Sequence, residues 1–156
     1  NSGGSAIVGG EIDRFQPWVY EARVRVLYHS GHHYGHGVGG FLLWTGNNRF
    51  NIYHTPTSVR FDHGGIPNFT DYPMDISQWH VIRMEGLGSL FTASVDGVII
   101  ANNYPGLTDG GNGFYIDLKP IGGGAQVEWD YIRFEAGPMA VPTEELTFGT
   151  VKALYR

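Results

Sequence analysis

Four histidines lie within eight residues of one glycine-rich segment, and their side chains could bind a metal ion or a sugar. They are His29, His32, His33 and His36. Neutral imidazoles are good ligands for zinc and copper. Glycines do not fix the ligand spacing that a metal site needs, and no carboxylate lies among these histidines. The segment therefore has three interpretations: a metal site, a polar loop at the end of a sheet, or a loop whose His and Tyr side chains contact sugars.

A second set of candidates is aromatic and lies near predicted strand ends and loops. Sugars present apolar C–H faces that stack on Trp and Tyr rings, while polar groups bind the hydroxyls. The predicted ligand-binding residues are Tyr34, Trp44, Tyr53, Tyr104, His32 and His36. Trp79 and Trp129, by contrast, lie within strand patterns, so we expect them in the core.

The segments that must position these residues show the period-two alternation of β-strands. In the first clear example, apolar residues at even positions alternate with charged residues at odd positions. The apolar set is Tyr20, Ala22, Val24 and Val26, and the charged set is Glu21, Arg23 and Arg25. Similar patterns predict strands at 41–46, 49–55, 58–63, 79–87, 89–103, 112–119 and 125–137.

Turns and loops separate these strands. Asp96-Gly97 lies between two apolar runs, which is a strong indication of a tight hairpin. Residues 29–40 are predicted to form a Gly/His loop, and residues 64–77, which contain two prolines, a second loop. Residues 145–156 fit either a closing strand or a short helix. The pattern as a whole predicts nine or ten strands in an all-β sandwich.

The composition supports this fold class and excludes several functions. The chain has 156 residues, which suits one domain over 1–156, and its 24 glycines favour short strands and tight turns over helices. Lys and Arg total 10 against 15 acidic residues, so no basic excess is present to bind nucleic acid. No apolar run is long enough to span a membrane, and the absence of cysteine excludes disulfides and thiol catalysis.

The two ends of the chain differ from the centre. Residues 1–10 are rich in Gly and Ser and are expected to form an extended lead-in. Such a segment could pair with a sheet edge, either in its own chain or in a neighbouring copy. Residues 138–156 follow the last clear strand and are expected to form a C-terminal closing segment.

Three motifs in the second half resemble concanavalin A-like domains. The segments are QWHVIRME, LFTASVDGVIIANN and QVEWDYIRFE, within residues 78–135. In that family a strand with Trp-His precedes an Asp-Gly hairpin, and a late strand carries Asp-Tyr-Ile/Val-Arg. The family includes laminin G-like modules, laminarinase-type glycoside hydrolases and carbohydrate-binding modules. The resemblance implies a two-sheet antiparallel jelly-roll sandwich.

The resemblance also implies two kinds of site. Laminarinase-type enzymes carry an alternating E-x-D-x-x-E motif, which gives the two carboxyl groups of retaining hydrolysis. Here Glu11-Ile12-Asp13 begins such a pattern, but Gln16 stands where the second Glu would be. In related proteins, the Asp of the late strand often holds a structural calcium ion with groups from the N-terminal segment. That position is Asp130, and Glu11 could complete the oxygen shell.

These observations lead to one functional hypothesis and two alternatives. The first is a non-catalytic, secreted or cell-surface module that binds a poly- or oligosaccharide. The second is a structural subunit of an extracellular assembly, whose N-terminal segment docks on another copy of the chain. The third is a polysaccharide-cleaving enzyme whose catalytic residues differ from the motif above.

Overall fold

The computed structural model of the chain is a sandwich of two antiparallel β-sheets. It describes residues 4–7, 15–29, 40–46, 48–55, 57–62, 69–108, 111–118 and 125–137. All of the regular structure within these ranges is β-strand. The prediction of an all-β, two-sheet sandwich is therefore confirmed.

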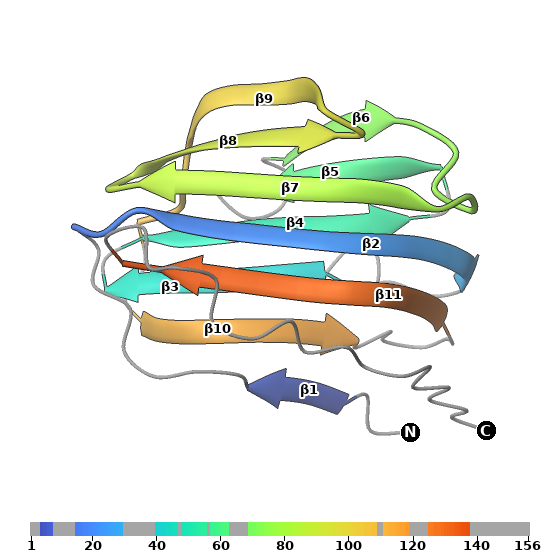
Figure 1. Cartoon of the computed structure of the whole chain (residues 1–156), viewed down its shortest axis with the longest axis horizontal. Helices are drawn as coiled ribbons and strands as arrows, with labels where there is room; N and C mark the ends of the chain where they lie inside the picture. Colours follow the sequence, from blue (N-terminus) through green and yellow to red (C-terminus); the bar gives the residue numbers. More distant parts are fainter. Residues whose placement is uncertain are drawn as a thin grey trace.

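One sheet has six strands in the order β1-β10-β3-β4-β5-β6, and the other has five in the order β11-β2-β7-β8-β9. Figure 1 shows the five-stranded sheet in front of the six-stranded one. The six-stranded sheet is formed by β1 (Gly4–Ile7), β10 (Gly111–Leu118), β3 (Gly40–Gly46), β4 (Arg49–Thr55), β5 (Ser58–Asp62) and β6 (Phe69–Pro73). The five-stranded sheet is formed by β11 (Ala125–Ala136), β2 (Trp18–His29), β7 (His80–Leu87), β8 (Leu90–Val95) and β9 (Val98–Pro105).

The strands that the alternation predicted most clearly lie at the centre of the five-stranded sheet. On β2, Tyr20, Ala22, Val24 and Val26 are all buried, as expected. β2 pairs with β11 on one side and with β7 on the other, so strands far apart in the chain are neighbours.

The hairpin between β8 and β9 turns at Asp96 and Gly97, whose φ angles are 49° and 80°. Two consecutive positive φ values are the signature of a type I′ turn, which confirms the predicted hairpin.

Two strands were not predicted. β6 lies inside the expected loop 64–77, where the prolines suggested irregular structure. It is an edge strand that pairs only with β5, and an edge tolerates Pro73 because no ladder hydrogen bond is lost on the open side.

β1 lies inside the N-terminal lead-in and pairs with β10 of its own chain. Of the two pairings expected for that segment, the structure shows the one within the chain. The predicted closing segment 138–156 lies outside the described residues.

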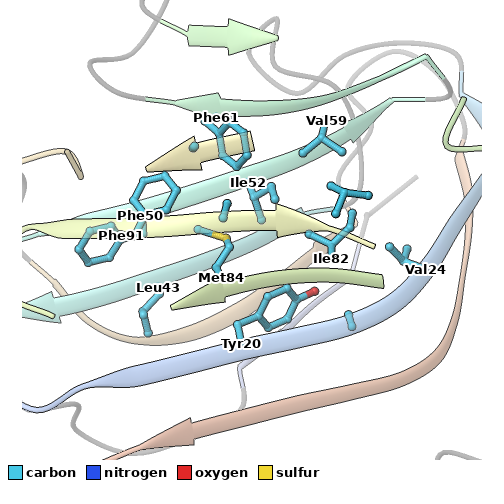
Figure 2. Packing of buried hydrophobic residues seen from close by; sticks show 14 of the residues in the cluster. Tyr20, Val24, Leu43, Phe50, Ile52, Val59, Phe61, Ile82, Met84 and Phe91 are labelled. Atoms are coloured by element: carbon cyan, nitrogen blue, oxygen red, sulfur yellow. The ribbon is translucent and has the colours of Figure 1, made fainter. Parts of the chain in front are cut away.

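The core fills the space between the two sheets (Figure 2). Phe50, Ile52 and Phe61 come from the six-stranded sheet, while Tyr20, Met84 and Phe91 come from the five-stranded sheet. The Phe50 and Phe91 rings meet edge to face with centroids 5.7 Å apart, which joins the two sheets directly. The inward residues of each strand are therefore fixed by this core, and the alternate residues must face away from it.

Candidate functional site

The outer face of the six-stranded sheet carries buried polar residues on its central strand, β4. Phe50 and Ile52 point into the core, so Asn51 and Tyr53 lie on the opposite face. Asn51 is only 1% exposed and Tyr53 only 5%. Polar groups are costly to bury unless they are hydrogen-bonded, so a strand buried on both faces needs a specific reason to carry them.

An arginine and an aspartate extend this face across the next two strands. Arg60 on β5 donates from Nε to Asp71 Oδ1 and from Nη2 to Asp71 Oδ2, both at 2.6 Å. The arrangement is bidentate, which is the strongest geometry for an arginine and a carboxylate. The hydrogen bond from Arg60 lowers the pKa of Asp71, burial opposes this in part, and the charge of Arg60 and a bond from Ser58 lower it further. Asp71 is therefore a carboxylate at neutral pH.

Tyr53, Arg60 and Asp71 are aligned in one row because of strand register. Tyr53 is the partner of Arg60, and Arg60 is the partner of Asp71. On its other side Tyr53 is opposite Gly40 of β3, which is in turn opposite Asp117 of β10. Gly40 has no side chain, so no β3 side chain stands between Tyr53 and β10 along this row. We call Tyr53, Arg60 and Asp71 the outer-face row.

The outer-face row has the chemistry of hydroxyl recognition. A guanidinium donates hydrogen bonds in a fixed fork, a carboxylate accepts them, and a phenolic hydroxyl does both. The carboxylate of Asp71 is 37% exposed and the side chain of Arg60 15%, so both reach the surface. The sequence did not single out Arg60 or Asp71. The signal for Arg60 was its outward position in an alternating strand, whereas Asp71 fell in a segment assigned to a loop.

Two of the predicted ligand-binding residues lie on this sheet. Tyr53 belongs to the row, and its side chain is buried because β4 is buried on both faces. Trp44 lies on β3, and its register partner is Arg49 rather than Tyr53. The structure therefore places the two residues at different levels of neighbouring strands. Binding at either residue stays a prediction.

Tyr104 lies on the other sheet, in the edge strand β9. Its ring centroid is 5.4 Å from that of Phe91 and 6.0 Å from that of Phe61. Its hydroxyl is 2.8 Å from the hydroxyl of Thr70 on β6. Because β9 and β6 are edge strands of different sheets, Tyr104 closes one open side of the sandwich. This packing separates it from the outer-face row.

The remaining predicted ligands fall outside the described residues. These are Tyr34, His32 and His36, predicted to contact a sugar, and Glu11, predicted to bind calcium. The possible metal site at His29, His32, His33 and His36 involves the same undescribed segment. All of these assignments stay predictions.

Asp130, the other predicted calcium ligand, is engaged by a cation of the protein itself. Its Oδ2 atom accepts a hydrogen bond from Nη1 of Arg23 at 2.7 Å, and its side chain is 52% exposed. Among the described residues, no group of three His, Cys, Asp or Glu is placed to hold a metal ion. Its predicted partner Glu11 lies outside the described residues, so the calcium site stays a prediction.

Trp79 differs from the expectation that it lies in the core. It precedes β7 and lies on the outer face of the five-stranded sheet, where the guanidinium carbons of Arg23 and Arg25 are 5.1 and 4.7 Å from its ring centre. Arg25 also pairs with Glu128, so this face is an ion-pair ladder. Trp129, as expected, packs against the core, although it is only partly buried. Trp79 therefore lies beside ion pairs on the outer face of this sheet and not in the core.

Solved structures show the same architecture. A structure described as a native glycosidic hydrolase matches with a TM-score of 0.55 and 19% identity, over 84% of this chain and 67% of that one. The carbohydrate-binding module CBM66 from Bacillus subtilis matches with a TM-score of 0.55 and 15% identity, over 86% and 84%. The Bacillus licheniformis β-glucanase matches with a TM-score of 0.53 and 13% identity, over 83% and 69%.

The chain has a concanavalin A-like jelly-roll fold. This confirms the fold that the Trp-His, Asp-Gly and Asp-Tyr-Ile-Arg motifs implied. No protein-family model matches the sequence, and no curated protein does so either. At these identities the similarity establishes the jelly-roll fold, and function must be argued from residues.

In the part of the chain that the structure describes, no helix is long and apolar enough to cross a membrane.

Proposed function

We propose that this protein binds a poly- or oligosaccharide on the outer face of its six-stranded sheet, as a secreted or cell-surface module. The observation that carries the proposal is the outer-face row, in which Tyr53, Arg60 and Asp71 are aligned across three neighbouring strands. This row runs across three strands and presents the partly exposed Arg60–Asp71 pair, a hydrogen-bond donor and an acceptor, beside the buried ring of Tyr53. The resemblance to a carbohydrate-binding module and to glucan hydrolases of the same fold supports it.

The Arg60–Asp71 pair is the element best suited to sugar hydroxyls. Vicinal hydroxyls can donate to a carboxylate and accept from a guanidinium at the same time, and both side chains are already oriented by their mutual bonds. A ligand that meets oriented groups loses less conformational freedom on binding. The acidic and basic charges of the pair cancel, which favours neutral sugars over strongly charged polymers.

The first test of this proposal is a glycan array with the wild-type chain and the Arg60→Gln variant. We expect the wild type to bind at least one glycan class. Arg60→Gln should reduce that affinity by about tenfold to a hundredfold, because a bond to a charged donor contributes about 1.5–3 kcal/mol. Affinities of the positive glycans are then measured by isothermal titration calorimetry.

Arg23→Gln is the matched control. It makes the same substitution in an Arg–Asp pair on the outer face of the other sheet, away from the proposed site. We expect this variant to bind like the wild type, and both variants to keep the wild-type circular dichroism spectrum. A blank wild-type array, or equal losses in the two variants, would contradict the proposed site. Release of reducing ends from a bound glycan would favour the enzyme alternative over the non-catalytic one.

Trp44 on β3, the strand that pairs with β4, gives a second test of the same site. Trp44→Ala, on β3 opposite Arg49, is expected to weaken binding if the ligand extends along the sheet beyond the outer-face row. Titration calorimetry with the glycan found on the array measures this effect. Unchanged affinity in Trp44→Ala together with a loss in Arg60→Gln would confine the site to β4, β5 and β6.

A further inference from the structure

His80, the first residue of β7, connects two parts of the fold through its ring. Its Nδ1 atom is 2.7 Å from Asp96 Oδ2, in the turn between β8 and β9. Its Nε2 atom is 2.8 Å from the backbone carbonyl oxygen of Asp75, in the connection between β6 and β7. The imidazole therefore spans from the hairpin turn to residues 74–79, which carry the chain from one sheet to the other.

Both partners of the His80 ring are hydrogen-bond acceptors, so the protonated ring fits the site better than the neutral one. A neutral imidazole has one N–H and can donate to only one of them, whereas an imidazolium donates to both. Burial of the ring lowers the pKa of His80, but the hydrogen bonds to Asp96 and Asp75 and the charges of both carboxylates outweigh it, so the pKa is raised above its ordinary value. The geometry and the electrostatics therefore favour the charged ring.

The carboxylate of Asp96 is held from two directions. Its Oδ1 atom accepts from the amide of Val81 at 2.9 Å, and the Asp96 amide donates to the Val81 carbonyl at 2.9 Å. Burial raises the pKa of Asp96, but the Val81 amide and His80 lower it by more, so the net shift is downward. Asp96 is thus an anion wherever His80 titrates, and only the ring changes charge near neutral pH.

The segment joined to this turn crosses between the sheets. Ile76 is fully buried in the core, and its carbonyl accepts from the amide of Val26 at 2.8 Å. Trp79, at the end of the segment, lies against Arg23 and Arg25 of β2. The charges of these two arginines are paired with Asp130 and Glu128, so Asp75 and Asp96 are the carboxylates that act on the ring.

We propose that His80 is a pH-dependent clamp that holds the 74–79 connection to the β8–β9 turn when its ring is protonated and releases it in part when the ring is neutral. When the segment opens, the ring is exposed to water and returns to its ordinary pKa of 6.5. Because the closed form has the higher pKa, closure is strongest below pH 6.5 and weakens as pH rises through the raised value. The proposal does not rest on the glycan site, because its contacts are made by His80, Asp96 and Asp75, none of which belongs to the outer-face row.

Amide hydrogen exchange at pH 5.5 and pH 8.5, about one and a half pH units either side of neutrality, tests the clamp. The reporters are the amides of Val26, Met74 and Ile76, which bond to the carbonyls of Ile76, Thr57 and Met74 and so involve the connection itself. The reference is the amide of Gly106, which bonds to the Ser89 carbonyl elsewhere in the fold. Each rate is divided by that of an unstructured peptide at the same pH. We expect protection of the three reporters to fall several-fold at the higher pH, while protection of Gly106 does not change.

His80→Gln separates this clamp from a general effect of pH. Glutamine keeps a polar side chain but cannot gain a proton, so the pH dependence of the three reporters should disappear in this variant. An equal fall in both proteins, or no fall in the wild type, would overturn the proposal. If the variant does not fold, the ring of His80 is titrated by NMR in the wild type. A value at or below 6.5 would also overturn the proposal.

Discussion

Replacement of Phe91 by alanine is expected to lower the free energy of unfolding by about 3–5 kcal/mol, the cost of removing a large aromatic side chain from a packed core. Phe91 is 1% exposed and lies on β8, in the five-stranded sheet. Its ring centroid lies 5.7 Å from those of Phe50 and Phe61, which both belong to the opposite sheet. Removal of this ring leaves a cavity between the two sheets, which lose its contacts with Phe50 and Phe61.

Urea denaturation followed by circular dichroism measures this loss for the Phe91→Ala variant. The control is Ile99→Ala on the neighbouring strand β9, where the side chain is 60% exposed. A surface truncation of this kind is expected to change stability by no more than about 0.5 kcal/mol. A loss of less than about 1 kcal/mol in the free energy of unfolding of Phe91→Ala would mean that the sheets are not packed as described. Truncation of a phenylalanine in a packed core costs more than that.

The second large effect is expected at Gly86, where a methyl group has no room. A Cβ atom built at this position would lie 2.4 Å from Trp18 Cζ2 and 2.8 Å from the carbonyl oxygen of Leu90. Trp18 is itself buried and is the register partner of Gly86. Because neither the ring nor the backbone can withdraw without opening the core, Gly86→Ala should cost about 1–3 kcal/mol, and Gly86→Val more.

A double-mutant cycle with Trp18→Leu identifies the origin of that cost. In the Trp18→Leu background the clash with the ring is removed and only the contact with the Leu90 carbonyl remains. Gly86→Ala should therefore destabilise the variant by less than it destabilises the wild type, which is a measurable coupling energy. If the two costs add without coupling, the ring of Trp18 does not cover Gly86.

Both predictions depend on contacts between strands or between sheets, which a single segment of sequence does not reveal. The inward residues of β2 were predicted because period-two alternation is a local property, visible in one strand alone. The same is true of the Asp96-Gly97 turn, since its two positive φ values depend on residue types at two adjacent positions. β6 was missed because Pro73 indicates a loop unless the strand is known to be at an edge, and the edge is a property of the whole sheet.

The candidate site shows the same division. The sequence identified Tyr53 as an aromatic residue near a strand end, but a single strand does not reveal whether its outer face is covered, and the structure buries this ring. Trp79 was expected in the core because its neighbours alternate, and the structure instead places it against two arginines. In both cases the missing information is which residues of distant segments lie opposite.

The sequence by itself determined the all-β class, the central strands, the hairpin at Asp96-Gly97 and the resemblance to the concanavalin A-like fold, because each follows from residues that are near one another in the chain. Only the tertiary structure decided that Arg60 joins Asp71, that Tyr53 shares their row and that His80 reaches both Asp75 and Asp96. These contacts are set by the register of antiparallel strands and by the path of the chain between sheets. A shift of one residue in that register would turn each of these side chains to the opposite face.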